Sequence, residues 1–158
     1  MSWTDLINAL IFISPAYFAN GSALISKGNI PIDMGKKFID GRRILGDGKT
    51  VEGFLMGVTV GSFVGFLLGD AFFGFLSGLG AMTGDAIGSF VKRRLGLKRG
   101  EFFYPWDQID FLIGAYVFLS PFYSINIYHA LIILALTPVV HLLANVVAYA
   151  LKIKKEPW

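Results

Sequence analysis

Five apolar stretches, the fourth of them short, are separated by polar segments and most constrain the fold of this chain. Of its 158 residues, 54% are hydrophobic and 16% are charged, whereas a soluble domain has about 25% charged residues. A helix needs about 20 apolar residues to cross a bilayer core about 30 Å thick. The pattern predicts an all-α, polytopic integral membrane protein of about five transmembrane helices, near residues 5–25, 53–69, 71–92, 107–120 and 129–151.

Every lysine and arginine follows the first, third or fifth of these stretches. The 14 cations form three groups: Lys27, Lys36, Lys37, Arg42, Arg43 and Lys49; Lys92, Arg93, Arg94, Lys98 and Arg99; Lys152, Lys154 and Lys155. Positive charge favours the cytoplasmic side of a membrane. We therefore predict a multi-pass protein of the cell membrane with its N-terminus outside and its C-terminus in the cytoplasm. One catalytic domain would span residues 1–158, with cytoplasmic segments at 26–52 and 92–106.

Three aspartates lie where the third and fourth stretches meet the cytoplasmic side. Asp85 precedes Lys92 by seven residues, which places it about 10 Å inside the membrane boundary if the segment is helical. An acidic group at that depth needs a partner and suggests a function. Asp107 and Asp110, three residues apart, share a helix face. Carboxylates beside many cations suit Mg²⁺ and a polyphosphate, with the active site at the cytoplasmic face. The structural alternative is that the cations anchor lipid headgroups and that Asp107 and Asp110 cap a helix.

A glycine-rich basic segment, residues 40–53, leads into the second stretch. Such a segment can present backbone N–H groups and a helix N-terminus to phosphate. Its spacing does not match that of a P-loop. The alternative is a polybasic loop that only touches anionic lipids.

Three polar residues in the first and fifth stretches are weaker candidates. Asn20 is expected to line the same cavity as the aspartates. His141 and Asn145, one turn apart, are expected to form a polar pair at a helix interface, with a catalytic role as the alternative. Cysteine is absent, which excludes disulfides, thiolate metal sites and cysteine nucleophiles.

The segment that starts at Ser89 resembles a family signature. Ser89, the pair Lys92-Arg93, Lys98, Pro105 and then Asp107 and Asp110 follow the motif of the CDP-diglyceride synthases (phosphatidate cytidylyltransferases). Arg99 stands where that motif has aspartate, and the Gly-His-Gly-Gly insertion after the proline is missing. These departures, the small size and the run Gly48-Lys49-Thr50-x-Glu52-Gly53 resemble the archaeal branch, the CDP-archaeol synthases, over nearly the whole chain.

This resemblance implies a CTP-dependent nucleotidyltransferase of ether phospholipid biosynthesis in archaea. Its substrate would be unsaturated archaetidic acid (2,3-bis-O-geranylgeranyl-sn-glycerol 1-phosphate), its products CDP-archaeol and pyrophosphate, and its cofactor Mg²⁺. The resemblance assigns metal binding to Asp85, Asp107 and Asp110, and catalysis to these three with Lys92 and Arg93. Substrate binding is expected at Asn20, Arg43, Gly48, Lys49, Thr50, Glu52, Ser89 and Lys98. The expected partners are CTP, the lipid phosphate and the bilayer; no nucleic acid is expected, and a homodimer stays open.

Other functions fit the same composition less well. A CDP-alcohol phosphotransferase begins its motif as Asp40-Gly41 does, but Ile44 and Leu45 break it and the three-residue aspartate spacing differs. A CTP-dependent polyprenol kinase would transfer one phosphate rather than CMP. A small ion-coupled transporter would carry polar residues through to the outer face, whereas the outer halves of the second to fourth stretches are almost wholly apolar.

Overall fold

The computed structural model of this chain describes residues 3–26, 28–98, 101, 103–150 and 152. Its described part contains five helices: α1 (Trp3–Ile25), α2 (Val51–Leu67), α3 (Ala71–Arg94), α4 (Trp106–Leu119) and α5 (Ile127–Ala150). Two isolated β-bridges occur in the α1–α2 loop region but no strand forms over these residues, so the all-α prediction is confirmed. The cations Lys27, Arg99, Lys154 and Lys155 lie outside the described residues.

The starts of α2 and α3 are set by side-chain caps. Thr50 precedes α2 in an extended conformation and accepts a hydrogen bond from the N–H of Gly53, 3.2 Å away. Asp70 does the same for α3 by accepting from the N–H of Phe73 at 2.8 Å. Each cap satisfies a backbone donor that the helix itself cannot. The second carboxylate oxygen of Asp70 accepts from the Tyr123 hydroxyl at 2.7 Å, which ties the α2–α3 turn to the α4–α5 connection.

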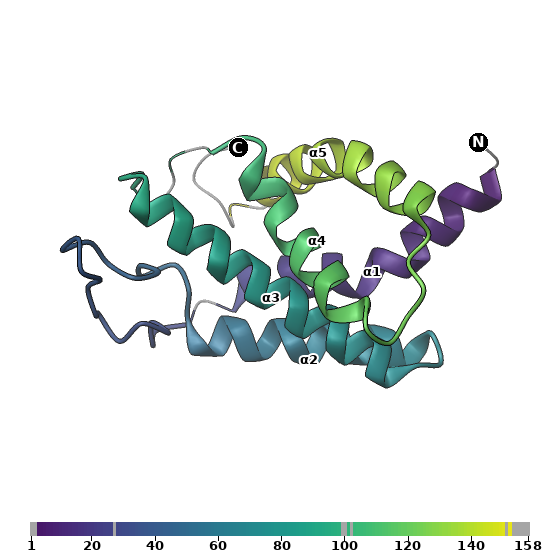
Figure 1. Cartoon of the computed structure of the whole chain (residues 1–158), viewed down its shortest axis with the longest axis horizontal. Helices are drawn as coiled ribbons and strands as arrows, with labels where there is room; N and C mark the ends of the chain where they lie inside the picture. The colour runs from purple at the N-terminus through teal and green to yellow at the C-terminus, as the bar shows by residue number, and fades with distance from the viewer. Residues whose placement is uncertain (1–2, 27, 99–100, 102, 151, 153–158) are drawn as a thin grey trace.

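Helix α3 lies at the centre of the bundle. It packs most extensively against α4 and α2, while α1 packs on α2 and α3, and α5 contacts α1 and α4 (Figure 1). The N-terminus, the α2–α3 turn and the α4–α5 connection lie at one end of the molecule, at the right of Figure 1. The α1–α2 loop and the end of α3 lie at the opposite end. The segments that carry most of the described cations are therefore neighbours in space.

Glycines allow α3 to approach both of its neighbours closely. A Cβ atom on Gly61 of α2 would lie 2.8 Å from the Cα of Gly78. On the other side of α3, a Cβ on Gly84 would lie 2.2 Å from the backbone oxygen of Asp110 in α4. Small residues at such contacts let helix backbones pack without intervening side chains. The closeness of α3 to α4 holds the aspartate-bearing segments of these helices together.

Two of the described helices, α1 and α5, are long and apolar enough to cross a membrane by length and composition. Helix α2 is apolar but has 17 residues, and α4 has 14. Helix α3 has 24 residues and ends in Lys92, Arg93 and Arg94. Five membrane crossings remain a prediction, and so does the orientation derived from the cations.

Candidate functional site

A polar pocket of about 330 Å³ is lined by residues of all five helices, α4 contributing Asp107, and by the end of the α1–α2 loop. We call it the polar pocket. Its charged lining residues are Lys49, Asp85 and Asp107. Its other lining residues are Tyr17, Asn20, Gly21, Ala23, Leu24, Ile32, Gly48, Thr50, Gly53, Phe54, Met82, Ala86, Val140, His141, Ala144 and Asn145. The pocket therefore brings together residues from both ends of the sequence.

Asp85, predicted to lie inside the membrane and to need a partner, has a partner in the structure. The Lys49 ammonium lies 2.5 Å from the Asp85 carboxylate, and both side chains are largely buried. Lys49 comes from the glycine-rich segment and Asp85 from the middle of α3, 36 residues later. The ion pair neutralises the acid and links the two constellations that the sequence had suggested separately.

A second lysine neutralises Asp107. The Lys92 ammonium lies 2.7 Å from the Asp107 carboxylate and also donates to the backbone oxygen of Glu101 at 2.7 Å. The same carboxylate oxygen accepts the N–H of Phe103 at 3.1 Å. Asp107 lines the polar pocket, whereas Lys92 is buried behind it. Lys92 is therefore placed to orient Asp107 and to hold the α3–α4 connection.

Asp110 lies apart from the lining of the polar pocket. It is 9% exposed and borders a smaller apolar groove of about 210 Å³ between α3 and α4. A Cβ on Gly88 would lie 2.0 Å from its carboxylate, so the side chain fills the space that this glycine leaves. Asp110 is still within electrostatic range of Asp85 and Asp107.

Arg43 does not line the polar pocket. It belongs to a group of ion pairs and hydrogen bonds around the buried Asp33 in the α1–α2 loop, which we call the Asp33 cluster. Its guanidinium contacts Asp33 at 2.6 Å and Asp47 at 2.6 Å. Asp33 also accepts the N–H groups of Leu45 and Gly46, each at 2.9 Å. Burial by itself raises the pKa of Asp33, but the bonds from Arg43 and from these N–H groups outweigh it and hold the pKa well below its usual range. Asp33 stays ionised and fixes the shape of the loop.

Glu52 also holds the loop. Its carboxylate accepts the N–H of Asn29 at 3.0 Å and that of Ile30 at 3.2 Å. The entry of the α1–α2 loop is thereby pinned to the first turn of α2. Arg43 and Glu52, both predicted to bind substrate, thus have observable contacts within the loop.

The remaining predicted residues divide between the pocket and its surroundings. Asn20, Gly48 and Thr50 line the polar pocket, whereas Ser89, Arg93 and Lys98 are not among its lining residues. Arg93 donates to the backbone oxygen of Leu97, and Lys98 is exposed. The glycine-rich segment therefore supplies more of the pocket than the motif cations of the α3 end.

Three further lining residues, Tyr17, His141 and Asn145, were not assigned to the site from the sequence, although a catalytic role was the alternative for His141 and Asn145. The Tyr17 hydroxyl lies 2.7 Å from the Thr137 hydroxyl, and the His141 ring stacks on Phe111 with ring centres 6.0 Å apart. Asn145 lies one turn further along α5 and faces the same pocket. The signal was present: polar side chains in an apolar membrane helix usually face the protein interior or a cavity. Which cavity they face depends on how α5 packs on α1 and α4.

Two carboxylates of the pocket are chemically suited to a divalent cation. Over the described residues, no three His, Cys, Asp or Glu side chains form a ready-made metal cluster. Mg²⁺, however, is usually held by one or two carboxylates together with substrate phosphates, rather than by a complete protein cage. Asp85 and Asp107 line one pocket and supply hard oxygen donors. They fit a divalent ion that arrives with a polyphosphate.

Comparison with known proteins covers nearly the whole chain. A family model described as CarS-like, CDP-archaeol synthase, matches residues 3–158. A CDP-archaeol synthase of Methanopyrus kandleri is 48% identical, with 99% of this chain and 96% of the relative covered. One from Pyrococcus abyssi is 47% identical, with 97% and 98% covered.

A solved structure supports the same relationship. It is described as "Structural insight into an intramembrane enzyme for archaeal membrane lipids biosynthesis". Its TM-score is 0.79 at 38% sequence identity, and the match covers 89% of this chain and 94% of that chain. The two chains are therefore similar in sequence as well as in fold.

Proposed function

The chain belongs to the CDP-archaeol synthase family, and from this premise we propose that the polar pocket is where it joins CTP to its lipid substrate. The enzyme is a CTP-dependent cytidylyltransferase and a membrane protein. A phosphate oxygen of the lipid bonds to the α-phosphorus of CTP as the bond to pyrophosphate breaks. CDP-archaeol and pyrophosphate are the products.

The Lys49–Asp85 ion pair carries the assignment of the reaction to this pocket. It joins a flexible cation to an acid inside the bundle, at a separation of 2.5 Å. Transfer of a nucleotidyl group needs mainly positioning and charge neutralisation, rather than a protein nucleophile. Lys49 is suited to neutralise triphosphate oxygens, and Asp85 to hold the ammonium in place until the nucleotide arrives. The second pair, Lys92–Asp107, keeps the next carboxylate aimed at the same cavity.

The start of α2 is suited to bind phosphate. Gly48 and Thr50 line the polar pocket beside Lys49, and Thr50 is the first residue before the helix. Backbone N–H groups at a helix N-terminus and the helix dipole both favour an anion. We assign the triphosphate to this position, with Asn20 on the facing wall.

A divalent metal is typical of this family, and we propose Mg²⁺ held by Asp85 and Asp107. When bound, it would neutralise phosphate charge and polarise the phosphoryl oxygens. Asp110, packed behind these residues against Gly88, would support them from outside the pocket lining. Arg43, Glu52, Ser89, Arg93 and Lys98 would then act from outside the pocket lining, by holding the loop or by guiding substrates.

CTP and a lipid phosphate are the substrates implied by the family, and we propose unsaturated archaetidic acid as the lipid. CTP would enter from the cytoplasm, where the cation-rich segments raise the local concentration of anions. The lipid would arrive laterally between helices. The orientation proposed from the cations, with N-terminus out and five crossings, sets the pocket at the cytoplasmic face.

A transfer assay with matched acid-to-amide variants tests this proposal. Purified protein receives CTP labelled at the α-phosphate, Mg²⁺ and the lipid phosphate, and the labelled CDP-lipid is measured. We expect Asp85→Asn and Asp107→Asn each to lower kcat/KM by about 10²-fold or more.

Asp70→Asn is the matched control, because Asp70 caps α3, the α2–α3 turn lies at the opposite end of the bundle from the α1–α2 loop (Figure 1), and asparagine caps a helix equally well. It should keep the wild-type rate. Near wild-type transfer by Asp85→Asn would remove the pocket from the mechanism. A parallel reaction with CTP labelled at the γ-phosphate would reveal a lipid kinase instead, because only a kinase passes that label to the lipid.

A further inference from the structure

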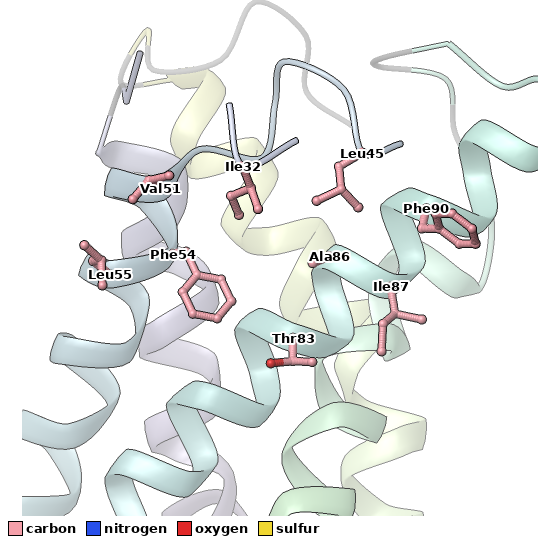
Figure 2. Close-up of a pocket in the computed structure, with 9 residues that line it drawn as sticks. All are labelled: Ile32, Leu45, Val51, Phe54, Leu55, Thr83, Ala86, Ile87 and Phe90. Atoms are coloured by element: carbon pink, nitrogen blue, oxygen red, sulfur yellow. The ribbon is translucent and has the colours of Figure 1, made fainter. Parts of the chain in front are cut away.

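An apolar groove runs along the outside of the bundle between α2 and α3. Figure 2 shows it beneath the α1–α2 loop, with side chains from both helices and from the loop converging on one space. Its volume is about 480 Å³, within the range of about 300–1,000 Å³ typical of ligand pockets. Nine residues line it: Ile32, Leu45, Val51, Phe54, Leu55, Thr83, Ala86, Ile87 and Phe90.

The lining of this α2–α3 groove is suited only to hydrocarbon. Among the lining residues that the structure describes, Thr83 alone has a polar side chain, and its hydroxyl donates to the backbone oxygen of Leu79 at 2.8 Å. The hydroxyl is thus already used within α3. A polar ligand would lose its hydrogen bonds to water in this groove without replacement, which is costly.

The α2–α3 groove adjoins the polar pocket. Ile32, Phe54 and Ala86 line both spaces. Three consecutive residues of α3 connect the two spaces. Asp85 lines the polar pocket, Ala86 lines both spaces, and Ile87 lines the groove. A molecule with a charged head beside Asp85 can therefore reach the groove with an apolar tail within one turn of α3.

The roof of the groove is built by the same loop that supplies the polar pocket. Ile32 and Leu45 point down from the loop toward the helices in Figure 2. The Asp33 cluster connects these two residues, because Asp33 follows Ile32 in the chain and accepts the N–H of Leu45 at 2.9 Å. The N–H of Ile32 donates to the backbone oxygen of Lys49 at 2.8 Å. An ordinary lipid-facing surface has no such roof linked to a lysine of the proposed substrate site.

The loop end of the groove is also held by contacts with α3. Arg94 lies over the rings of Phe38 and Phe90, at 4.8 Å and 4.9 Å from their centres. Its guanidinium also contacts Asp40 at 2.7 Å. Phe90 is itself a lining residue. These contacts fix the loop over the groove, so the roof is part of the fold and not a chance contact.

We infer that the α2–α3 groove binds one isoprenoid chain of the lipid phosphate while its phosphate group lies in the polar pocket. This inference rests on the function proposed above. Phe54 and Ala86 separate the two parts of the substrate, and Ile32 and Leu45 cover the chain. Chain length and branching would then be selected by a surface fixed by the nucleotide-binding loop.

Filling the groove with a larger side chain tests the inference. Leu55 lines the groove and is 60% exposed, so Leu55→Trp adds bulk there without entering the core. Leu67→Trp is the matched control, since Leu67 is on the same helix, is 67% exposed and is not a groove residue. The probes are two lipid phosphates, one with geranylgeranyl chains and one with dimethylallyl chains.

We expect Leu55→Trp to raise KM for the geranylgeranyl lipid by about tenfold, comparable to other losses of fit in apolar pockets. The KM for the dimethylallyl lipid should change several-fold less, and Leu67→Trp should resemble wild type with both lipids. A geranylgeranyl lipid with a photoreactive group in the chain should crosslink to Val51, Leu55 or Ile87. CTP binding by each variant checks that it is folded.

Equal KM values for the long-chain lipid in Leu55→Trp and wild type, or crosslinks only to residues outside the groove, would overturn the inference. Crosslinking that bulk membrane lipid abolishes as well as the substrate does would indicate ordinary lipid contact and would also overturn it. If wild type forms no CDP-lipid from either probe, the proposed function fails instead. The two failures are therefore distinguishable.

Discussion

Among single residues, the aspartates of the loop and pocket differ in what neutralises them. Asp85 and Asp107 are each paired with a lysine, whose ammonium is a compact point charge on a flexible chain. Asp33 is held by an arginine and by backbone N–H groups, which present a fixed geometry. The lysine pairs suit a site that must admit a charged substrate, and the Asp33 cluster suits a structural role.

The Asp33 cluster predicts how the thermal stability of the protein depends on pH. Because the folded-state pKa of Asp33 is lowered, its stabilising effect is complete above its ordinary pKa of about 4 and is lost as pH falls below that value. We expect Asp33→Asn to lower the thermal unfolding temperature at pH 7, and its deficit relative to wild type to shrink below about pH 4. Thermal unfolding in detergent across this pH range measures both effects.

Asp47→Asn is the control for this experiment. Asp47 also contacts Arg43 at 2.6 Å, but its side chain is 65% exposed, and exposed ion pairs contribute little. It should lower the unfolding temperature much less than Asp33→Asn. A deficit of Asp33→Asn that grows as the pH falls would contradict the assignment.

At the scale of helices, two glycine faces on α3 determine how the bundle closes. Gly74 and Gly78 meet α2, whereas Gly80, Gly84 and Gly88 meet α4. The nearest atoms to several of these positions are backbone atoms, which cannot move aside as a side chain can. Helix α3 is therefore held between two neighbours, and its acidic residues inherit fixed positions.

Adding one methyl group to the α2–α3 contact should destabilise the protein. A Cβ on Gly61 would lie 2.8 Å from the Cα of Gly78, and we expect Gly61→Ala to cost about 1–3 kcal/mol through overpacking. Gly21→Ala is the matched change in α1, where a Cβ meets nothing within 4 Å; it should be neutral or stabilising by up to about 1 kcal/mol. Thermal unfolding of the two variants decides the point. Equal stability of both would show that α2 and α3 can separate without cost.

At the scale of the whole molecule, the segments that connect the helices lie at two opposite ends of the bundle. The N-terminus, the α2–α3 turn and the α4–α5 connection lie together, opposite the α1–α2 loop and the end of α3 (Figure 1). The charge pattern of the sequence predicts that the second of these ends is cytoplasmic. The α2–α3 groove and the polar pocket both lie toward that end, beneath the loop.

Single cysteines test this orientation directly, because the chain has none of its own. Ser124→Cys lies in the α4–α5 connection, and Ile39→Cys lies in the α1–α2 loop at a residue that is 95% exposed. In intact cells, a membrane-impermeant maleimide should label Ser124→Cys, and it should label Ile39→Cys only after permeabilisation. The opposite pattern would invert the topology, and label on the cysteine-free parent would expose a faulty assay.

The class of the fold and the family could be predicted from the sequence, since both depend on patterns that are local along the chain. Apolar length indicates membrane helices whatever their arrangement, and the spacing of Ser89, Lys92, Arg93, Asp107 and Asp110 identifies the motif. The need of Asp85 for a partner also followed, because its position seven residues before Lys92 predicts that it lies within an apolar span.

The identity of that partner, and the lining of the pocket, were decided only by tertiary structure. Lys49 meets Asp85 because α2 packs on α3 through glycines, and His141 and Asn145 reach the pocket because α5 contacts α1. Periodicity places a side chain on a face of its own helix but does not say which helix that face meets. The α2–α3 groove also depends on the α1–α2 loop, whose shape is set by the Asp33 cluster. Sequence pattern thus determined which chemistry the chain carries, and packing determined which residues share a cavity.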